Sequence, residues 1–166
     1  LSAGDWKGLL DGLPGRLVLV NTTASSFPFL EELSRAGRVV ITATDAAGQQ
    51  FATVFPEYFV EALADRNADI DKDGRASIWE VFMFATARVR RHYEQRGQLP
   101  TERALIDDNG DRVGADGLSL SREPNRRHLV DQLDAGFLER RNEGFRIAPG
   151  SFDHRHVLLA NDFDVL

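Results

Sequence analysis

Residues Leu17–Ser26 read L-V-L-V-N-T-T-A-S-S, and they carry the main indication of the fold. The apolar run that begins this stretch is short and unbroken, which favours a strand buried on both faces. It ends abruptly in a polar cluster, residues 21–26. A second run of the same kind, Val39-Val-Ile-Thr-Ala43, ends in the polar loop 44–50. In parallel sheets, ligands and active sites gather at the carboxyl ends of strands, so the two polar loops mark where a site is expected.

Helical periodicity surrounds these two strands. The spacing of apolar residues and the capping residues predict helices over 2–13, 28–35, 55–64 and 78–97. Further strands are expected at 103–106, 145–147 and 157–159, and a short helix around 129–137. Alternating strands and helices indicate an α/β fold with a doubly wound, mostly parallel sheet. The tail after residue 111 changes character and is expected to be an α+β extension.

The twelve residues Asp69–Glu80, D-I-D-K-D-G-R-A-S-I-W-E, carry the clearest chemical signal. Three aspartates alternate, a glycine follows, and a serine and a glutamate come later at fixed intervals. This spacing matches positions 1, 3, 5, 6, 9 and 12 of an EF-hand calcium loop. Calcium takes six to eight oxygen ligands at about 2.3–2.6 Å, and carboxylates two residues apart can turn inward from a tight loop.

Each residue of the pattern has an expected role. Gly74 permits the sharp bend because it lacks a Cβ. Arg75 offers its backbone carbonyl, Ser77 acts directly or through water, and Glu80 closes the shell with two oxygens. The sequence therefore predicts calcium as the cofactor, with these metal ligands: Asp69, Asp71, Asp73, Arg75, Ser77 and Glu80.

The same residues have a second interpretation as an acidic turn without metal. Ser77 and Glu80 form the S-x-x-E pattern of a helix capping box, and aspartate and glycine are common in turns. A cap and a calcium ligand are compatible, because the exiting helix of such a loop begins there. Ala76 stands where paired EF-hands carry a branched apolar residue. We therefore expect a single loop set into another fold, which argues against a calcium-responsive switch.

A second acidic cluster spans Ile106 to Arg112, I-D-D-N-G-D-R. Asp107, Asn109 and Asp111 again alternate. However, Arg112 stands at the position of the loop glycine, and Leu118 stands where the glutamate would be. This cluster is predicted to be a turn, with a weak calcium site as the alternative.

The overall composition narrows the function. The chain has 166 residues, 42% of them hydrophobic, and a formal net charge of −6, which argues against a nucleic-acid binder. No apolar run approaches the ~18 residues of a membrane span. The absence of cysteine rules out a disulfide, a thiolate zinc site and a cysteine nucleophile, and leaves the compartment open, with a secreted or periplasmic location as a hypothesis.

Three stretches together resemble a known family. They are L-V-L-V-N-T-T-A-S-S, then V-V-I-T-A-T-D-A-A-G-Q-Q-F-A-T-V-F, then A-D-I-D-K-D-G-R-A-S. The chain from Leu1 to Asp111 is similar to the second half of the legumain and caspase-like cysteine peptidases, and especially to bacterial legumain-like proteins with an acidic loop in this place. The resemblance implies their doubly wound sheet without its first strands, which are expected to precede Leu1 or to come from a partner.

The catalytic residues of that family are not matched. The first strand there ends in a catalytic cysteine, and aligning the strand ends puts Thr23 at that position and Ser25 at a nearby serine. The family's histidine follows an earlier strand that this chain does not contain. The resemblance therefore implies the fold and not the peptidase activity.

Two functional interpretations follow. The first is a non-catalytic legumain-like domain (residues 1–111, with the loop 69–80 inserted) that holds a structural calcium ion and acts as a binding or scaffold module, followed by an extension of unknown role (112–166). The second is a hydrolase that uses Thr23 or Ser25 with a histidine from outside this chain. A hydroxyl needs an adjacent base to act as a nucleophile, and the sequence indicates none.

Overall fold

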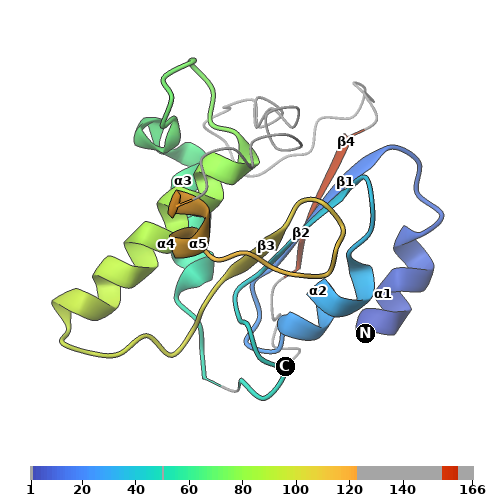
Figure 1. Cartoon of the computed structure of the whole chain (residues 1–166), viewed down its shortest axis with the longest axis horizontal. Helices are drawn as coiled ribbons and strands as arrows, with labels where there is room; N and C mark the ends of the chain where they lie inside the picture. Colours follow the sequence, from blue (N-terminus) through green and yellow to red (C-terminus); the bar gives the residue numbers. More distant parts are fainter. Residues whose placement is uncertain (1, 50, 123–154, 161–166) are drawn as a thin grey trace, which may run out of the picture.

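Four strands form one sheet in the part of the chain that the structure, a computed structural model, describes: residues 2–49, 51–122 and 155–160. The strands are β1 (Arg16–Asn21), β2 (Arg38–Thr42), β3 (Leu105–Asp107) and β4 (Arg155–Ala160), in the order β3-β2-β1-β4 (Figure 1). β1 is parallel to β2 and to β4, whereas β3 is antiparallel to β2. The predicted α/β class is confirmed, with a mixed sheet.

The register of β1 and β2 brings their carboxyl ends together. Val18 pairs with Val39 and Asn21 pairs with Thr42, so both strands end at the same edge of the sheet. The two polar loops therefore lie next to each other, as their positions in the sequence predict.

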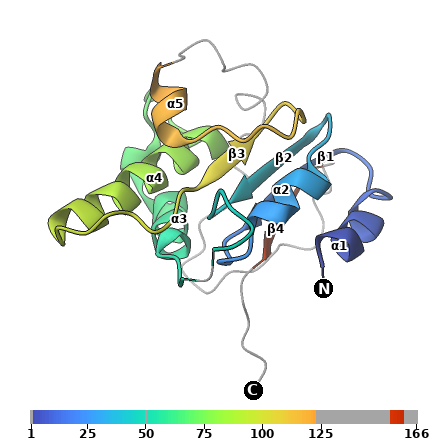
Figure 2. The ribbon, with the colours of Figure 1, turned by 60° about the horizontal axis from the view of Figure 1, so that its bottom comes forward.

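Helices cover both faces of the sheet. They are α1 (Ala3–Leu10), α2 (Phe27–Leu33), α3 (Phe55–Ala64), the 3-10 turn η1 (Arg66–Ala68), α4 (Ile78–Gln95) and α5 (Gly117–Arg122). α1 and α2 lie on one face, and α3 and α4 lie on the other (Figures 1 and 2). The loop of interest joins η1 to α4.

Alternating side chains of β1 and β2 serve two separate cores. Leu17 and Leu19 pack with the helices α1 and α2, while Val18 and Val20 pack toward α3 and α4. The second core is rich in aromatic residues: the ring of Phe55 lies 5.4 Å from that of Phe59 and 6.3 Å from that of Phe82. Because both faces are buried, the strands read as continuous apolar runs rather than as alternating ones.

Several expected elements differ in detail from the observed ones. The strand expected at 103–106 is β3, Leu105–Asp107, and the one expected at 157–159 lies within β4. β4 comes from the expected C-terminal extension and pairs with β1 in the same sheet. Within the expected extension, α5 begins at Gly117, where Asp116 Oδ1 accepts the N–H of Ser119 at 2.7 Å. The expected helix around 129–137 and strand at 145–147 lie outside the described residues.

Candidate metal site

The loop Asp69–Glu80 is a tight turn with two residues in the left-handed region. Lys72 has a φ of 60° and Gly74 a φ of 95°. The bend at Gly74 therefore occurs where the spacing predicts it, in a conformation that favours glycine. α3 ends at Ala64 and α4 begins at Ile78, so the loop and η1 make up the whole connection between these two helices.

Each aspartate of the loop holds a backbone N–H with one carboxylate oxygen. Asp69 Oδ2 accepts from Gly74 N at 3.0 Å, Asp71 Oδ1 from Asp73 N at 3.1 Å, and Asp73 Oδ1 from Arg75 N at 2.8 Å. These bonds close the turn and fix the direction of the three side chains. Arg75 is the residue whose carbonyl is the expected ligand, and its backbone N–H is fixed by the bond to Asp73.

The three carboxylates form a compact group. One oxygen from each of Asp69, Asp71 and Asp73 lies within 4.8 Å of the others, a spacing that can hold a metal ion. Asp71 and Asp73 are exposed, and Asp69 is half-buried. The Oδ1 atom of Asp69 is buried and accepts no hydrogen bond from any residue that the structure describes. A buried carboxylate oxygen without a partner is costly, so this atom needs an explanation.

Ser77 and Glu80 form the capping box that begins α4. Ser77 Oγ accepts the N–H of Glu80, and Glu80 Oε2 accepts both the N–H and the hydroxyl of Ser77 at 2.8 Å. Glu80 Oε1 also accepts the N–H groups of Ile70 at 2.8 Å and Asp71 at 3.1 Å. The cap is therefore confirmed, and Glu80 is 5% exposed. Glu80 is not a member of the compact group formed by the three aspartates.

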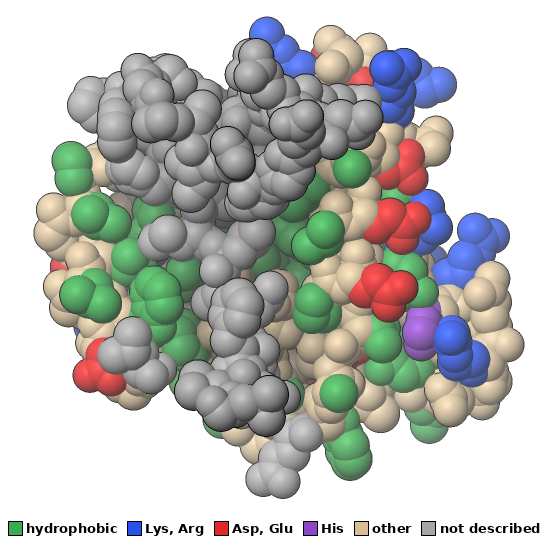
Figure 3. Space-filling model, turned by 180° about the vertical axis from the view of Figure 1, so that it is seen from behind, with side chains coloured by type: hydrophobic (Ala, Val, Ile, Leu, Met, Phe, Trp, Pro, Cys, Tyr) green, Lys and Arg blue, Asp and Glu red, His purple; other side chains and the backbone are tan. Residues whose placement is uncertain are grey.

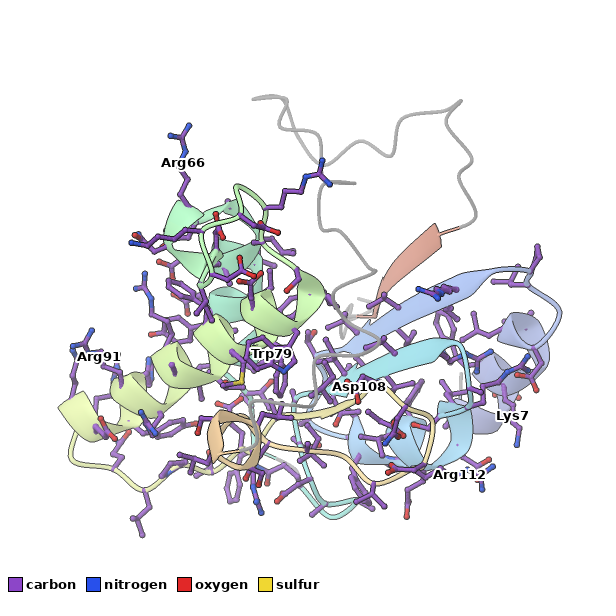
Figure 4. The ribbon with its side chains drawn as sticks, turned by 45° about the horizontal axis from the view of Figure 1, so that its top comes forward. Lys7, Arg66, Trp79, Arg91, Asp108 and Arg112 are labelled. Carbon is purple, nitrogen blue, oxygen red and sulfur yellow. The ribbon has the colours of Figure 1, made fainter. Side chains whose placement is uncertain are left out.

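The second acidic cluster has the same backbone turn as the first. Gly110 and Arg112 have φ values of 81° and 65°, at the positions of Lys72 and Gly74. Asp107 Oδ2 accepts from Arg112 N, Asn109 Oδ1 from Asp111 N, and Asp111 Oδ1 from Val113 N, at 2.8, 2.8 and 2.7 Å. The turn predicted here is present, at a different place on the molecule from the first loop, as the labelled Asp108 and Arg112 show (Figure 4).

The two turns differ at their first residue. Asp107 is 1% exposed, yet both of its oxygens have donors: Oδ1 accepts from Asn109 N at 3.2 Å and from Gly110 N at 2.7 Å, and Oδ2 from Arg112 N. Asp69, in contrast, keeps one buried oxygen without a donor among the described residues. The hydrogen-bonded turn alone therefore does not indicate a metal, whereas the unsatisfied oxygen of Asp69 distinguishes the first loop.

The polar loops at the ends of β1 and β2 are joined by hydrogen bonds. Ser26 Oγ accepts the N–H groups of Ala43 at 3.0 Å and Thr44 at 3.1 Å, and it pairs with Thr44 Oγ1 at 3.0 Å. Thr23 is half-buried, its N–H donates to the side chain of Asn21, and Ser25 is exposed. These contacts satisfy backbone groups after the strands, which is the ordinary role of such residues.

Among the described side chains there is one histidine, His92 on α4. It is half-buried, and its Nδ1 pairs with the hydroxyl of Tyr58 at 2.8 Å. This contact joins α4 to α3. The other histidines, at 128, 154 and 156, have no described side chain. The hydrolase interpretation takes its base from outside this chain and stays a prediction.

Two charged contacts that the sequence did not indicate fasten α3 and α4. The carboxylate of the buried Glu102 accepts the N–H groups of Val54 and Phe55 at the start of α3 and the hydroxyl of Tyr93 on α4. At the other end of the hairpin, Arg88 contacts Asp65 at 3.2 Å. The pKa of Asp65 is lowered, chiefly because its carboxylate accepts the N–H of Asn67, and Arg88 adds to the effect.

Charges of both signs lie side by side on this part of the surface. Seen from the side opposite to Figure 1, acidic and basic side chains neighbour one another along the edge that carries α3 and α4 (Figure 3). Arg88 contacts both Glu61 and Asp65 there. No helix in the described ranges is both long and apolar enough to span a membrane.

Comparisons with family models, with curated proteins and with solved structures find no match for this chain. The likeness to legumain and caspase-like peptidases therefore depends on the quoted residues alone.

Proposed function

We propose that this chain is a non-catalytic, caspase- or legumain-like α/β domain that is stabilised by one calcium ion in the loop Asp69–Glu80 and serves as a binding or scaffold module. The observation that supports it most is the buried, unsatisfied Oδ1 of Asp69 within a group of three carboxylates. Since Oδ2 of Asp69 is held by Gly74, Oδ1 is the oxygen left to meet a cation.

The donor set favours calcium. The compact group offers three carboxylates, the carbonyl of Arg75 adds a further hard oxygen ligand, and the loop contains no histidine, cysteine or methionine. Magnesium demands near-ideal octahedral geometry and keeps its waters, whereas calcium accepts the less regular arrangement of a flexible loop. A divalent ion would also offset the mutual repulsion of the three carboxylates, whose oxygens lie within 4.8 Å of one another.

The position of the loop favours a structural role for the ion. The loop connects two helices that pack on the sheet through Phe55, Phe59 and Phe82, which are fully buried. The residues from Asp71 to Arg75 are exposed and add nothing to that core. An ion there would add to the small apolar contacts that Ala68 and Ala76 give this connection, because a ligand that binds only the folded state stabilises it.

The scaffold part of the proposal rests on the family resemblance and on the missing cysteine. A domain that keeps a peptidase fold without its nucleophile retains surfaces for binding. The hydrolase alternative predicts peptide turnover that disappears in Thr23→Ala, and our proposal predicts no turnover with or without calcium.

A matched pair of variants tests the calcium site. Asp73 and Asp111 are both exposed, stand at the same position of the two turns, and each accepts the N–H two residues later. Asparagine keeps that acceptor and removes one charge. We expect calorimetric titration of the metal-stripped protein to show calcium binding that Asp73→Asn weakens and Asp111→Asn leaves unchanged.

The thermal melt gives the second readout. At a calcium concentration 100 times Kd the ion contributes about 2.7 kcal/mol, which raises the Tm of a chain of this size by roughly 5–10 °C. The absence of both heat and a Tm shift in the unmodified protein would refute the calcium site. Equal weakening by Asp73→Asn and Asp111→Asn would show that binding does not depend on the first loop specifically.

A further inference from the structure

Glu80 has a role in the loop that its position in the calcium pattern does not predict. Its carboxylate accepts four hydrogen bonds from the protein, two at each oxygen: Oε1 from the N–H groups of Ile70 and Asp71, and Oε2 from the N–H and hydroxyl of Ser77. An ionised carboxylate has about four lone-pair sites, so these donors use all of them.

The donors come from both ends of the loop. Ile70 and Asp71 belong to the incoming segment that carries the first two aspartates, and Ser77 begins α4. Glu80 thus ties the start of the loop to the first turn of the helix. The bond to Asp71 N also fixes the backbone of a residue whose side chain belongs to the compact carboxylate group.

Direct coordination of the ion by Glu80 would disturb this arrangement. Glu80 is 5% exposed and lies outside the group of oxygens within 4.8 Å of one another. To offer both oxygens to calcium it would have to release donors near the loop backbone. These bonds are part-buried, and loss of one hydrogen bond to an ionised carboxylate weakens closure of the loop by roughly 10- to 150-fold, which opposes coordination of the ion by Glu80.

We infer that Glu80 is a positioning residue that holds the calcium loop closed through its four hydrogen bonds, and that the ion is coordinated by Asp69, Asp71, Asp73, the Arg75 carbonyl and water. This inference rests on the proposed calcium site and narrows the expected ligand set. The four protein oxygens leave about two to four positions of the calcium shell for water. The loop would accordingly bind calcium more weakly than one closed by a bidentate glutamate.

Terbium luminescence measures the bound water directly. Trp79 precedes Glu80 in the first turn of α4 and packs against the core (Figure 4), which makes it a suitable sensitiser for Tb³⁺ in the loop. Luminescence lifetimes in H₂O and D₂O give the number of waters on the ion. We expect Glu80→Gln to lower Tb³⁺ affinity by about tenfold or more, because a neutral amide accepts fewer hydrogen bonds, and to leave the number of bound waters unchanged.

A gain of about two waters in Glu80→Gln would overturn the inference, because it would show that two ligand oxygens were lost. Ser77→Ala provides an independent test that leaves the charge of Glu80 in place. If Glu80 positions the loop, removing the hydroxyl donor weakens Tb³⁺ binding at an unchanged water number. If Glu80 is a ligand held back by the cap, the same change removes one of the two donors to Oε2 and strengthens binding.

Failure of the calcium site itself looks different. Absent sensitised luminescence in the unmodified 166-residue chain, or luminescence equal in Asp69→Asn, would remove the site and the inference with it. Luminescence that is lost in Asp69→Asn, together with a water number that rises in Glu80→Gln, would keep the site and overturn only the role of Glu80.

Discussion

Replacing Asp71 by asparagine separates the metal role of this loop from its role as a turn. Asn109 occupies the same position of the second turn and accepts an N–H from Asp111 at 2.8 Å, as Asp71 does from Asp73 at 3.1 Å. The substitution therefore preserves the hydrogen bond and removes one negative charge. Without metal, the loss of repulsion should make Asp71→Asn slightly more stable than the unmodified protein.

The size of the effect follows from the carboxylate spacing. Two unit charges 4.8 Å apart repel by about 0.9 kcal/mol in water, and Asp71 has two such neighbours, Asp69 and Asp73. Screening at physiological salt, with a Debye length of about 8 Å, reduces the sum to roughly 1 kcal/mol. This corresponds to a rise in Tm of about 2–4 °C in chelator.

Calcium should reverse this difference in stability, so that the unmodified protein becomes more stable than Asp71→Asn. A loop with fewer ligand charges binds calcium less tightly, so the calcium-induced rise in Tm is smaller for Asp71→Asn than for the unmodified protein. Differential scanning calorimetry in chelator and in millimolar calcium measures both effects. A loss of stability in chelator, unchanged by calcium, would mean that the charge of Asp71 serves the turn and would refute the reasoning.

Five further changes test the packing and the buried charges of the fold. In chelator, Gly110→Ala should lower the free energy of unfolding in urea by roughly 3–5 kcal/mol. The added Cβ would overlap the backbone of Arg35, and the φ of Gly110 is 81°. Gly74→Ala should lower the same free energy by only about 1–2 kcal/mol, because Gly74 has a φ of 95° but no atom within 4 Å of the added Cβ. Similar losses for Gly110→Ala and Gly74→Ala would contradict the steric clash at Gly110. By the same measurement, Glu102→Gln should lower the free energy of unfolding by about 2–3 kcal/mol, because the amide leaves buried donors unpaired. Tyr93→Phe should lower it by about 1 kcal/mol, because the phenyl ring loses one hydrogen bond. Variants as stable as the unmodified protein would contradict the buried contact. Burial raises the pKa of Asp116, but Ser119 and Arg103 lower it more, so its pKa lies below the ordinary value. Its contribution to stability is therefore present above about pH 4 and lost as the pH falls further; unfolding in urea at a series of acidic pH values should show a shallower loss for Asp116→Asn, and an identical pH profile would refute it.

The elements that the sequence predicts well are those whose signals are local. β1 and β2 read as continuous apolar runs because both faces are buried, and the ends of α1 and α4 are marked by capping boxes, at Ser2 and Ser77. The acidic loop is likewise local, since its turn is closed by bonds between residues two to five apart. Such signals lie in the chain itself and need no tertiary contact.

The features that the sequence does not reveal depend on distant parts of the chain. β3 has only three residues, and it pairs antiparallel with β2, where Val40 lies opposite Asp107, a partner 67 positions away. Arg38 begins an apolar strand, yet it is 5% exposed because the carbonyls of Leu33 and Leu10 accept its N–H groups. The residues next to β3 and Arg38 in the sequence indicate neither the strand pairing nor these hydrogen bonds.

Two similar local motifs also differ in a way that their spacing does not reveal. Asp69 and Asp107 begin turns with the same spacing and the same hydrogen bonds, so local sequence treats them almost alike. They differ because Asp107 Oδ1 meets two further N–H donors, whereas Asp69 Oδ1 is buried and meets none among the described residues. The spacing locates the loop, and the buried Oδ1 of Asp69 without a donor distinguishes it from a plain turn.

The placement of the loop explains why a cation would be useful there. The α3–α4 hairpin is held at the start of α3 by Glu102 and along its length by aromatic packing. At the connection, Ala68 and Ala76 make small apolar contacts, and the Asp65–Arg88 pair and the four hydrogen bonds of Glu80 add polar ones. Exposed ion pairs contribute little to stability, whereas a bound ion contributes in proportion to the logarithm of its concentration. Calcium would therefore secure the exposed part of this connection, residues 71–75, which apolar packing does not reach and which is expected to unfold first in its absence.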